Sequence, residues 1–382
     1  MLDKDTGLLL AGNFGDWLAV FKVDSALVSS SFFVRNLNTV AAAARVLGYD
    51  ADAERYEGWA RAIGDAFIKQ WWDSSLQRFK TAHGFQTSIA LPLFAGICSS
   101  ASQPNISTAC ARAVADVTIQ GECPAAPCES GTCSEQACFY PLHVTGGIMG
   151  AEALLPALSM AGRSDVALAV ALQPNFPSWS AMTRDGSGTL WELWDGALVD
   201  PEGSSRNHVM FSSVRTWAGV AVAGLSALHP GWTAALVAPD WRIVHSASNN
   251  ISSAGSSVVT PAGIISASWS SSSQSLHHKT TAGSSVRVIA SLPPPVSGTV
   301  CVPCFSCASA IITESSSIVW NGSSGFHPGV AGIRAAELQE AALLVRWSLA
   351  YPGAGASIAG GDGGGLSACF EVDSGSYLFE SD

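Results

Sequence analysis

The residues best suited to chemistry lie between Gly186 and Asp195 and in the segment Arg206–His208 that follows. Glu192 stands between two indoles, Trp191 and Trp194. Indole faces stack on the C–H faces of a pyranose, and a carboxylate held against apolar walls can be tuned to activate water. The pattern therefore favours sugar chemistry with Glu192 as the catalytic carboxylate. The alternative is structural: both indoles pack in a core, and Glu192 lies on the solvated side.

Two helices joined by a short turn are expected near the start of the chain. Apolar residues recur from Phe33 to Leu47 at spacings of four and three, and Gly48 is placed to end that helix. Asp50 or Asp52 can open a second helix, with an apolar stripe from Tyr56 to Trp71. Because the turn between them is very short, the two helices should form an antiparallel hairpin.

Further helices are expected along the first 230 residues. They are Gln86–Ile97, with Pro92 near its first turn or kinking it; a helix running from His143 to Gly162; Val166–Leu172, capped by Ser164; and a helix from Met210 to Leu228. Paired helices with long connecting loops suggest stacked hairpins, which can close into a toroid with a pocket at one end.

The character of the chain changes beyond Pro230, where Ser, Thr and Val dominate. Apolar and polar residues alternate in Ile265–Trp269 and in Val286–Val288, which predicts strands. We therefore expect a helical domain over residues 1–235 and a β domain over residues 236–382. The Gly- and Ala-rich segment Gly353–Ser367 is expected to be a loop or linker.

Composition excludes several classes of protein. The 382 residues are 48% hydrophobic and 13% charged, which is typical of a compact globular chain with room for two domains. The net charge of −11 provides no basic surface for nucleic acid. The sequence contains no apolar run long enough to span a membrane. Its eight His residues show no helical pairing typical of a metal site, and no cofactor is expected.

The ten cysteines indicate an oxidising compartment. Six of them crowd into residues 98–140, a segment rich in Pro, Ser and Gly that we interpret as a surface insert carrying Asn105. Zinc ligation is the alternative, but the cysteines lack paired CxxC knuckles and His partners. A redox role for Cys301 and Cys304 is disfavoured by their β-like surroundings. Three glycosylation sequons, at Asn105, Asn250 and Asn321, agree with a secreted or lumenal protein, although the sequence shows no signal peptide.

The order of several motifs resembles a known family. The motifs are Phe14–Leu18, Gln86–Thr87 with Ala90–Leu93, His143–Gly147, Pro177–Trp179, Gly188–Asp195, and Asn207–His208 with Met210–Phe211. In this order they resemble the bacterial-type α-L-rhamnosidases of glycoside hydrolase family 78. Segments Gly263–Trp269 and Val286–Pro293 are similar to the C-terminal β-sandwich of that family. The resemblance covers most of residues 12–300, apart from the Cys-rich insert.

This resemblance implies an (α/α)6 barrel, here a partial one, followed by an antiparallel β-sandwich. It implies removal of terminal α-L-rhamnose with inversion, a reaction that uses two carboxyl groups. Glu192 would be the general base that activates water. The remaining substrate-binding residues would be Asp16, Trp17, Trp191, Trp194, Asn207 and His208. For Trp17 the alternative is core packing, and for His208 it is helix capping or a satisfied buried imidazole.

One part of the family pattern has no counterpart. The family's general acid is a Glu in an acidic motif that ends in Gly-Trp-x-Gly-Asp and precedes the Gly-Asp-Trp-Leu segment, and this motif does not occur. Asp16, Asp185 and Asp195 are conceivable substitutes, but nothing in their spacing supports the role. We therefore expect a truncated or inactive rhamnosidase, with helix faces left uncovered and able to self-associate. The alternatives are a non-catalytic rhamnose-binding protein and a toroid enzyme of another specificity.

Overall fold

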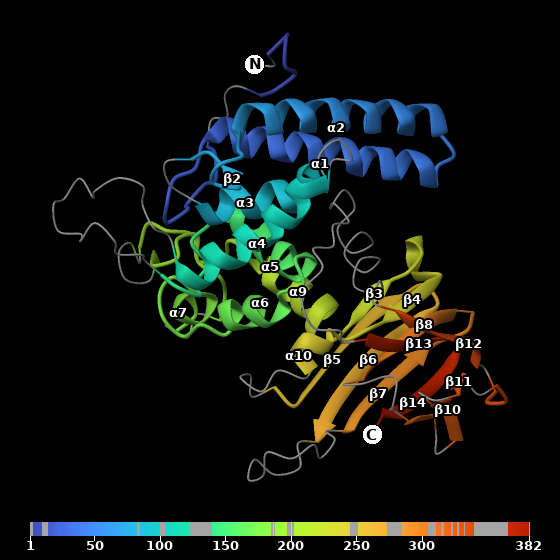
Figure 1. Cartoon of the computed structure of the whole chain (residues 1–382). Coiled ribbons are helices and arrows are strands. Elements are labelled where there is room, and N and C mark those ends of the chain that lie inside the picture. The colour runs from blue at the N-terminus through green and yellow to red at the C-terminus, as the bar shows by residue number, and fades with distance from the viewer. Residues whose placement is uncertain are drawn as a thin grey trace. The chain divides into compact units, whose positions relative to one another are not determined.

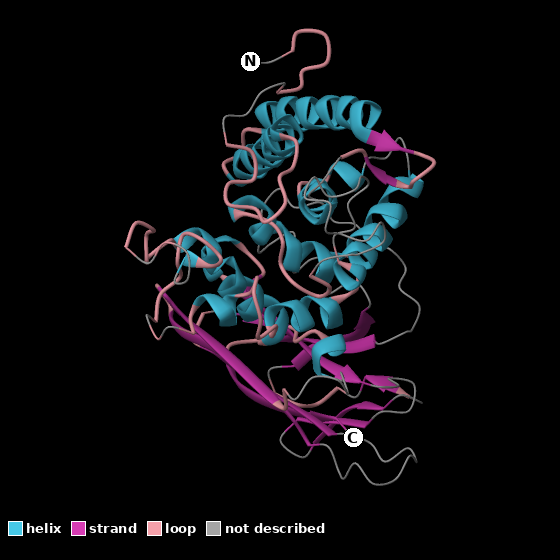
Figure 2. Cartoon of the chain, turned by 90° about the vertical axis from the view of Figure 1, so that its left-hand side faces the viewer, coloured by secondary structure: helices cyan, strands magenta, loops and turns pink. Residues whose placement is uncertain are grey.

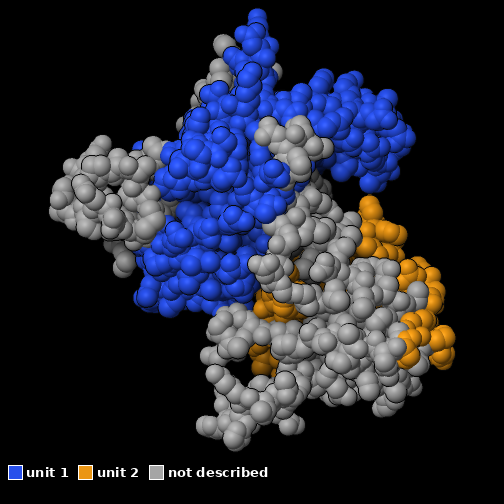
Figure 3. Space-filling view, viewed as in Figure 1, with its two compact units in different colours: residues 1–214, 351–361 blue, residues 215–350, 362–382 orange. Residues whose placement is uncertain are grey.

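The computed structural model describes most of the chain. The described residues are 3–9, 14–81, 85–99, 104–121, 140–184, 186, 188–196, 200, 202–244, 251–272, 285–295, 297–304, 311–314, 317–321, 324–326, 328–331, 333–339 and 366–381. They divide into two compact units, one up to residue 214 and the other from residue 215 onward (Figure 3). The first unit is helical and the second is built mainly of strands (Figures 1 and 2).

The first two helices form the predicted hairpin. α1 (Ser25–Val46) begins where the carboxylate of Asp24 accepts a hydrogen bond from the Ala26 N–H, and it ends at Leu47, followed by Gly48 in a left-handed conformation (φ +78°). α2 (Asp50–Trp71) packs against α1, and its buried residues include Ile63 and Phe67 from the predicted stripe.

A short ladder and an apolar helix follow. β1 (Trp72–Asp73) pairs with β2 (Arg78–Phe79), and the chain continues into α3 (Phe85–Phe94) and the 3-10 turn η1 (Ile97–Ser99). All ten residues of α3 are buried, so this helix lies in the interior of the unit. Pro92 lies inside the helix near its end, so the first of the two expected outcomes, a position near the first turn, is wrong.

The segment predicted as a surface insert contains a core helix. α4 (Pro104–Gln120) buries Cys110 and Val114 fully, although Asn105 is exposed. A disulfide between Cys98 and Cys110 joins it to η1. The prediction was wrong for this part because small residues such as Ala and Cys form a buried helix face without a conspicuous apolar stripe. Residues 122–139 lie outside the described part of the chain.

Among the described residues, three more helices and a turn precede residue 213. They are α5 (Ile148–Met160), α6 (Ser164–Ala171), α7 (Trp179–Met182) and the 3-10 turn η2 (Val209–Ser212). α5 starts later than predicted because His143–Gly147 forms an extended lead-in. Ser164 is the first residue of α6, so the N-cap position belongs to Arg163 and not to Ser164 as predicted, and the Ser164 hydroxyl bonds that of Ser159.

The predicted helix from Met210 to Leu228 stops early. α9 (Ser213–Trp217) runs into a π-helical turn, η3 (Ala218–Val222), and Gly224 (φ +81°) then turns the chain into a strand, β3 (Leu225–Ala227). A Cβ at Gly224 would come within 2.2 Å of the Pro239 nitrogen, so this residue must be glycine for tertiary reasons. Apolar periodicity alone could not reveal the change.

The second unit contains two sheets, one of seven strands in the order β11-β10-β9-β14-β7-β6-β5 and one of five in the order β12-β13-β8-β4-β3. All pairings are antiparallel except that of β4 with β8. The remaining bounds are β4 (Ala234–Val237), β5 (Ser253–Thr260), β6 (Gly263–Ser272), β7 (Ser285–Leu292), β8 (Ser297–Cys304), β9 (Ile311–Glu314), β10 (Ser317–Asn321), β11 (Gly325–Phe326), β12 (Ile333–Gln339), β13 (Leu366–Val372) and β14 (Gly375–Ser381), with the short helical segments η4 (Pro230–Trp232) and α10 (Trp241–Val244).

Both predicted strand segments are confirmed, because Ile265–Trp269 lies in β6 and Val286–Val288 in β7. A second disulfide joins Cys301 of β8 to Cys369 of β13, which are direct cross-strand partners. The core of the unit includes a stacked pair of rings, Phe370 and Phe379, with centroids 4.9 Å apart. Residues 353–365 of the predicted linker lie outside the described residues, and Leu366 and Ser367 begin β13. None of the described helices is long and apolar enough to cross a membrane.

Candidate functional site

The loop that carries Glu192 is held by two backbone hydrogen bonds. The Glu192 N–H donates to the carbonyl of Ser205 at 2.8 Å, and the His208 N–H donates to the carbonyl of Leu190 at 2.8 Å. Segment 190–192 therefore runs beside segment 205–208. The Ser205 N–H lies 3.4 Å from Oε2 of Glu192, and the hydroxyl of Thr189 donates to the carbonyl of Arg206.

Glu192 itself is half-buried, between two fully packed indoles. Trp191 is 2% exposed and Trp194 is 4% exposed. The guanidinium of Arg206 lies over the Trp191 ring, 5.0 Å from its centroid, which is the geometry of a cation–π contact. A positive charge is thus kept next to the loop that carries the candidate base.

Trp194 fixes the other end of this loop to the helical core. Its indole N–H donates to the carbonyl of Gly146 at 2.9 Å. Its ring meets Trp179 edge-on, with centroids 5.4 Å apart, and approaches Phe211 at 4.3 Å. Trp179 in turn donates its indole N–H to the carbonyl of Phe211 at 2.8 Å. This aromatic cluster anchors Trp194 in the core.

Asp16 is buried and braces the start of α5. Its Oδ1 accepts hydrogen bonds from the N–H groups of Met149 (2.9 Å) and Gly150 (3.0 Å). Its Oδ2 accepts from the Gly147 N–H (2.8 Å) and from the hydroxyl of Thr87 (2.7 Å). The carboxylate satisfies backbone donors at a helix N-terminus, where a negative charge is also favoured by the helix dipole.

Two opposing effects act on the acidity of Asp16. Burial raises the pKa of this carboxyl above its usual value, and the hydrogen bonds from Gly150, Thr87, Gly147 and Met149 lower it in part. The balance is a raised pKa. Both oxygens are nevertheless occupied by protein donors, so the clearest role of the side chain is to hold its neighbours in place.

Trp17 presents an aromatic face at the surface. It is 42% exposed and stands edge-on to the more exposed Phe14, with ring centroids 5.4 Å apart. Its carbonyl accepts a hydrogen bond from the Ile148 N–H at 3.0 Å, which ties this loop to the start of α5. Leu18 takes a left-handed conformation (φ +66°) that non-glycine residues rarely adopt, so the chain turns sharply after the indole.

The segment His143–Gly150 is the point where the motifs meet. Besides Asp16, Trp17 and Trp194, it binds Gln86, whose amide N–H donates to the His143 carbonyl (2.9 Å) and whose amide oxygen accepts from the Thr145 N–H (2.8 Å). A Cβ at Gly147 would come within 2.0 Å of the Trp17 carbonyl. The glycines of this segment are therefore required for the close approach of the other loops.

The predicted site residues fall into two groups. Asp16, Trp17 and Trp194 are joined through residues 146–150, while Glu192, Trp191, Asn207 and His208 lie on the paired loop 190–208. Asn207 is exposed and His208 is half-buried. Sequence reasoning missed Thr87, Gly147, Gly150 and Phe211 as parts of this arrangement, although Thr87, Gly147 and Phe211 stood in the motifs that carry the resemblance. The described residues contain no cluster of side chains that could hold a metal ion.

Comparisons with known proteins identify the family of the chain. The chain matches the model of the bacterial alpha-L-rhamnosidase 6 hairpin glycosidase domain over residues 3–124 and 134–222, which is more than half of its length. The chain belongs to this family. The resemblance based on the motifs is therefore confirmed, and the match includes most of the segment that we had excluded as an insert.

Relatives and solved structures cover different shares of the chain. An alpha-L-rhamnosidase of Alteromonas sp. (strain LOR) is 25% identical over 276 residues, or 68% of this chain and 27% of the relative, and one of Formosa agariphila is 22% identical over 69% of this chain and 27% of the relative. The chain thus spans about a quarter of the length of these relatives. The match to the structure of an alpha-L-rhamnosidase from Dictyoglumus thermophilum covers 99% of this chain and 34% of the chain in that structure (TM-score 0.69, 21% identity). The match to the structure of the Streptomyces avermitilis alpha-L-rhamnosidase complexed with L-rhamnose covers 98% of this chain and 28% of the chain in that structure (TM-score 0.66, 22% identity).

Proposed function

We propose that this chain carries the general-base half of an inverting α-L-rhamnosidase site, with Glu192 activating the water that attacks the anomeric carbon. The observation that supports this role is the placement of Glu192. It is half-buried between two buried indoles, on a loop whose backbone is fixed by Ser205 and Leu190. A base must be rigidly positioned and partly shielded from water, and this loop meets both requirements.

The sugar would stack on Trp17, because it is the one predicted indole with a largely exposed face. Trp191 and Trp194 are buried, so they would hold the loop that carries Glu192 in place without contacting the sugar. Asp16 would position Trp17 through its bonds to α5. Asn207 is exposed and available to a ligand hydroxyl, and His208 would help to orient the base or the sugar. No residue of the described chain is assigned as general acid.

This proposal extends to the architecture. The hairpin α1–α2 and the pairs α3–α4 and α5–α6 would form part of an (α/α)6 barrel, and the two sheets of the second unit would pack as a β-sandwich. The support is the family match over the helical unit and the likeness in fold to the solved structures.

The test is hydrolysis by the chain of an aryl α-L-rhamnoside whose phenol is acidic enough to leave without a general acid, with Glu192→Gln and Glu202→Gln compared. Glu202 is an exposed acid near the same loop, so its variant is the matched control. Loss of a general base should lower kcat by about 10²- to 10⁴-fold, whereas Glu202→Gln should not change it. Nuclear magnetic resonance should show the β-anomer as first product, since inversion is expected. Hydrolysis that Glu192→Gln leaves intact would contradict the assignment.

Absence of hydrolysis together with binding of L-rhamnose would favour the second candidate, a non-catalytic rhamnose-binding protein. The exposed Trp17 is the observation that supports it. Trp17→Ala should then abolish the change in fluorescence on adding L-rhamnose, whereas Trp59→Ala, which removes an exposed indole on α2, should not.

A further inference from the structure

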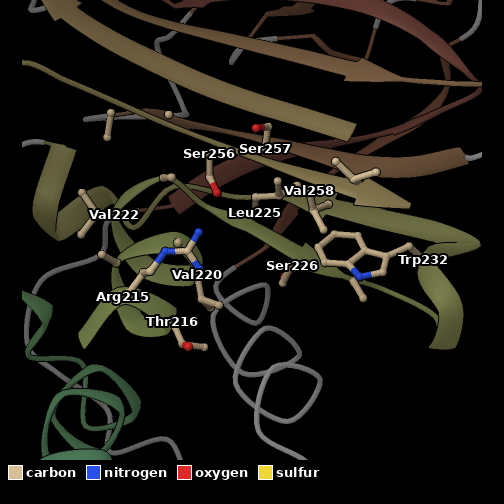
Figure 4. A pocket seen from close by; sticks show the side chains of 17 residues that line it. Arg215, Thr216, Val220, Val222, Leu225, Ser226, Trp232, Ser256, Ser257 and Val258 are labelled. Carbon is tan, nitrogen blue, oxygen red and sulfur yellow. The ribbon is translucent and has the colours of Figure 1, made fainter. Parts of the chain in front are cut away.

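The second unit contains a cavity of about 1150 Å³ that plays no part in the proposed rhamnose site. It is lined by η3, β3 and β5 and by the neighbouring residues of α9 and η4 (Figure 4). β3 and β5 are each the last described strand of their sheet. The cavity therefore lies along two sheet edges, and no further strand of the described residues covers them.

The polar side chains around this cavity are not engaged with the protein. Those of the lining are Arg215, Thr216, Ser226, Trp232, Ser256 and Ser257. None of them forms a side-chain hydrogen bond or ion pair within the described part of the chain. Ser226 is 3% exposed, and its buried hydroxyl has no partner. Arg215 and Thr216 are exposed and Ser256 is half-buried, so their donors are available to a ligand that enters the cavity.

The charge of the lining selects the class of ligand. Among the described residues that line the cavity, Arg215 alone is charged and no carboxylate accompanies it, in a chain whose net charge is −11. A guanidinium without a counter-ion, flanked by hydroxyl donors, is suited to a carboxylate. In Figure 4 the Arg215 side chain extends toward β5, where Ser256 and Ser257 lie.

An indole stands on the opposite side of the cavity from Arg215 (Figure 4). Trp232 takes a left-handed conformation (φ +61°) directly after Gly231 (φ +71°). Such a conformation is costly for a bulky side chain, by about 1–2 kcal/mol, and residues of this kind concentrate where binding requires them. Here it places an aromatic surface, which can stack on a pyranose ring, in the lining of the same cavity.

We propose that this cavity binds an acidic oligosaccharide, with Arg215 pairing with a uronate carboxylate and Trp232 stacking on a neighbouring sugar ring. The hydroxyl of Ser256 bonds a sugar hydroxyl between these two anchors. This cavity shares no residue with the proposed rhamnose site, and it gives the chain a second carbohydrate-binding site that recognises charge.

The test is calorimetric titration of the Glu192→Gln chain, so that binding does not depend on hydrolysis. The probes are trigalacturonate and its methyl ester, which has the same shape without the charge. Trigalacturonate should bind at least about tenfold more tightly than the ester, and raising the salt concentration should weaken its binding. Arg215→Ala should weaken the binding of trigalacturonate at least about tenfold. Trp232→Ala should weaken the binding of both trigalacturonate and its methyl ester, because stacking does not depend on charge.

Arg334→Ala is the matched control, because Arg334 is an exposed arginine of the same unit outside the cavity, paired with Asp373 at 3.2 Å. It should leave binding unchanged. Unchanged circular dichroism and an unchanged unfolding midpoint in Arg215→Ala would confirm that the variant folds. Equal affinity for the acid and the ester, an Arg215→Ala chain that binds as well as the parent, or no heat of binding at millimolar trigalacturonate would each overturn the proposal.

Discussion

The Oδ2 atom of Asp16 accepts a hydrogen bond from the Gly147 N–H at 2.8 Å, across 131 residues of chain. Through this bond and those to Met149 and Gly150, a surface loop that carries an exposed indole is joined to the first turn of a core helix. The helix begins at the glycines where the Trp194 indole also binds. The geometry of the candidate site therefore depends on one buried carboxylate.

Replacing that carboxylate should be costly. Asp16→Ala leaves three backbone N–H groups and the Thr87 hydroxyl without their acceptor, and bonds to a charged group are worth about 1.5–3 kcal/mol each. We expect the free energy of unfolding to fall by at least about 3 kcal/mol in urea denaturation. Asp16→Asn keeps one acceptor oxygen and should lose less. Asp5→Ala, an exposed control, should change the free energy by less than about 0.5 kcal/mol.

The raised pKa of Asp16 should also affect how the stability of the protein depends on pH. Burial raises the pKa of Asp16 in the folded state. The carboxyl therefore makes its full contribution to the free energy of unfolding below the unfolded pKa, and this contribution is lost as pH rises through the folded pKa. The stability difference between the parent and Asp16→Asn should therefore shrink as pH increases from about 4. Denaturation curves at a series of pH values measure it, and a difference that grows with pH would contradict the direction of the shift.

Asp165 provides the opposite case in the same unit. Burial raises the pKa of its carboxyl, but the hydrogen bonds and charge of Arg163 outweigh this effect, so the folded pKa is lowered. Its contribution is present above the unfolded pKa and is lost as pH falls. The difference in free energy of unfolding between the parent and Asp165→Asn should therefore become smaller as pH falls. The corresponding difference for Asp16→Asn should not become smaller as pH falls.

Close packing at Gly147 makes a further prediction. A Cβ there would lie 2.0 Å from the Trp17 carbonyl and 2.6 Å from the Ala19 nitrogen, both backbone atoms. Gly147→Ala should therefore cost at least about 2 kcal/mol of stability. Gly64→Ala is the control, because Gly64 lies within α2 and its added Cβ meets nothing within 4 Å. It should raise stability by about 0.5–1 kcal/mol, since alanine favours the helix. Equal losses in both variants would show that the predicted clash is absent.

Local periodicity was sufficient for part of this fold. The hairpin α1–α2 and the strands β6 and β7 were predicted because long apolar repeats and strict alternation depend only on neighbouring residues. The early end of the helix at Val222 was not, because it depends on how closely Gly224 approaches Pro239. α4 was missed because its buried face consists largely of small residues.

The candidate site could likewise be predicted from the sequence only in part. The Trp-Glu-x-Trp spacing identified Glu192, but it could not show that both neighbouring indoles are buried, because their burial depends on distant partners such as Gly146 and Phe211. The structural alternative for these indoles, core packing, agrees with their burial. Asp16 stood in a recognised motif, yet its bonds to α5 could be seen only once the chain had folded.

Trp194 should be sensitive to a conservative change. Trp194→Phe removes the indole N–H that bonds the Gly146 carbonyl and reduces the edge contact with Trp179. A buried carbonyl without its donor costs about 1–3 kcal/mol, and lost packing adds to it. We expect urea denaturation to show a total loss of about 2–4 kcal/mol. Trp59→Phe, at a position that is 51% exposed, should cost less than about 1 kcal/mol. Similar losses at the two positions would contradict the anchoring role of Trp194.

The two disulfides should differ in the stability that they provide. In the chain-entropy model a crosslink stabilises by restricting the unfolded chain, so a longer loop gives a larger effect. Cys301 and Cys369 are 68 residues apart, and Cys98 and Cys110 are 12 apart. Replacing both cysteines of a pair by Ala should cost about 4 kcal/mol for the first bond and about 3 kcal/mol for the second. Urea denaturation of the two double variants measures the order. The reverse order would mean that packing of Cys110 in the interior, which is fully buried, outweighs the entropy of the longer loop.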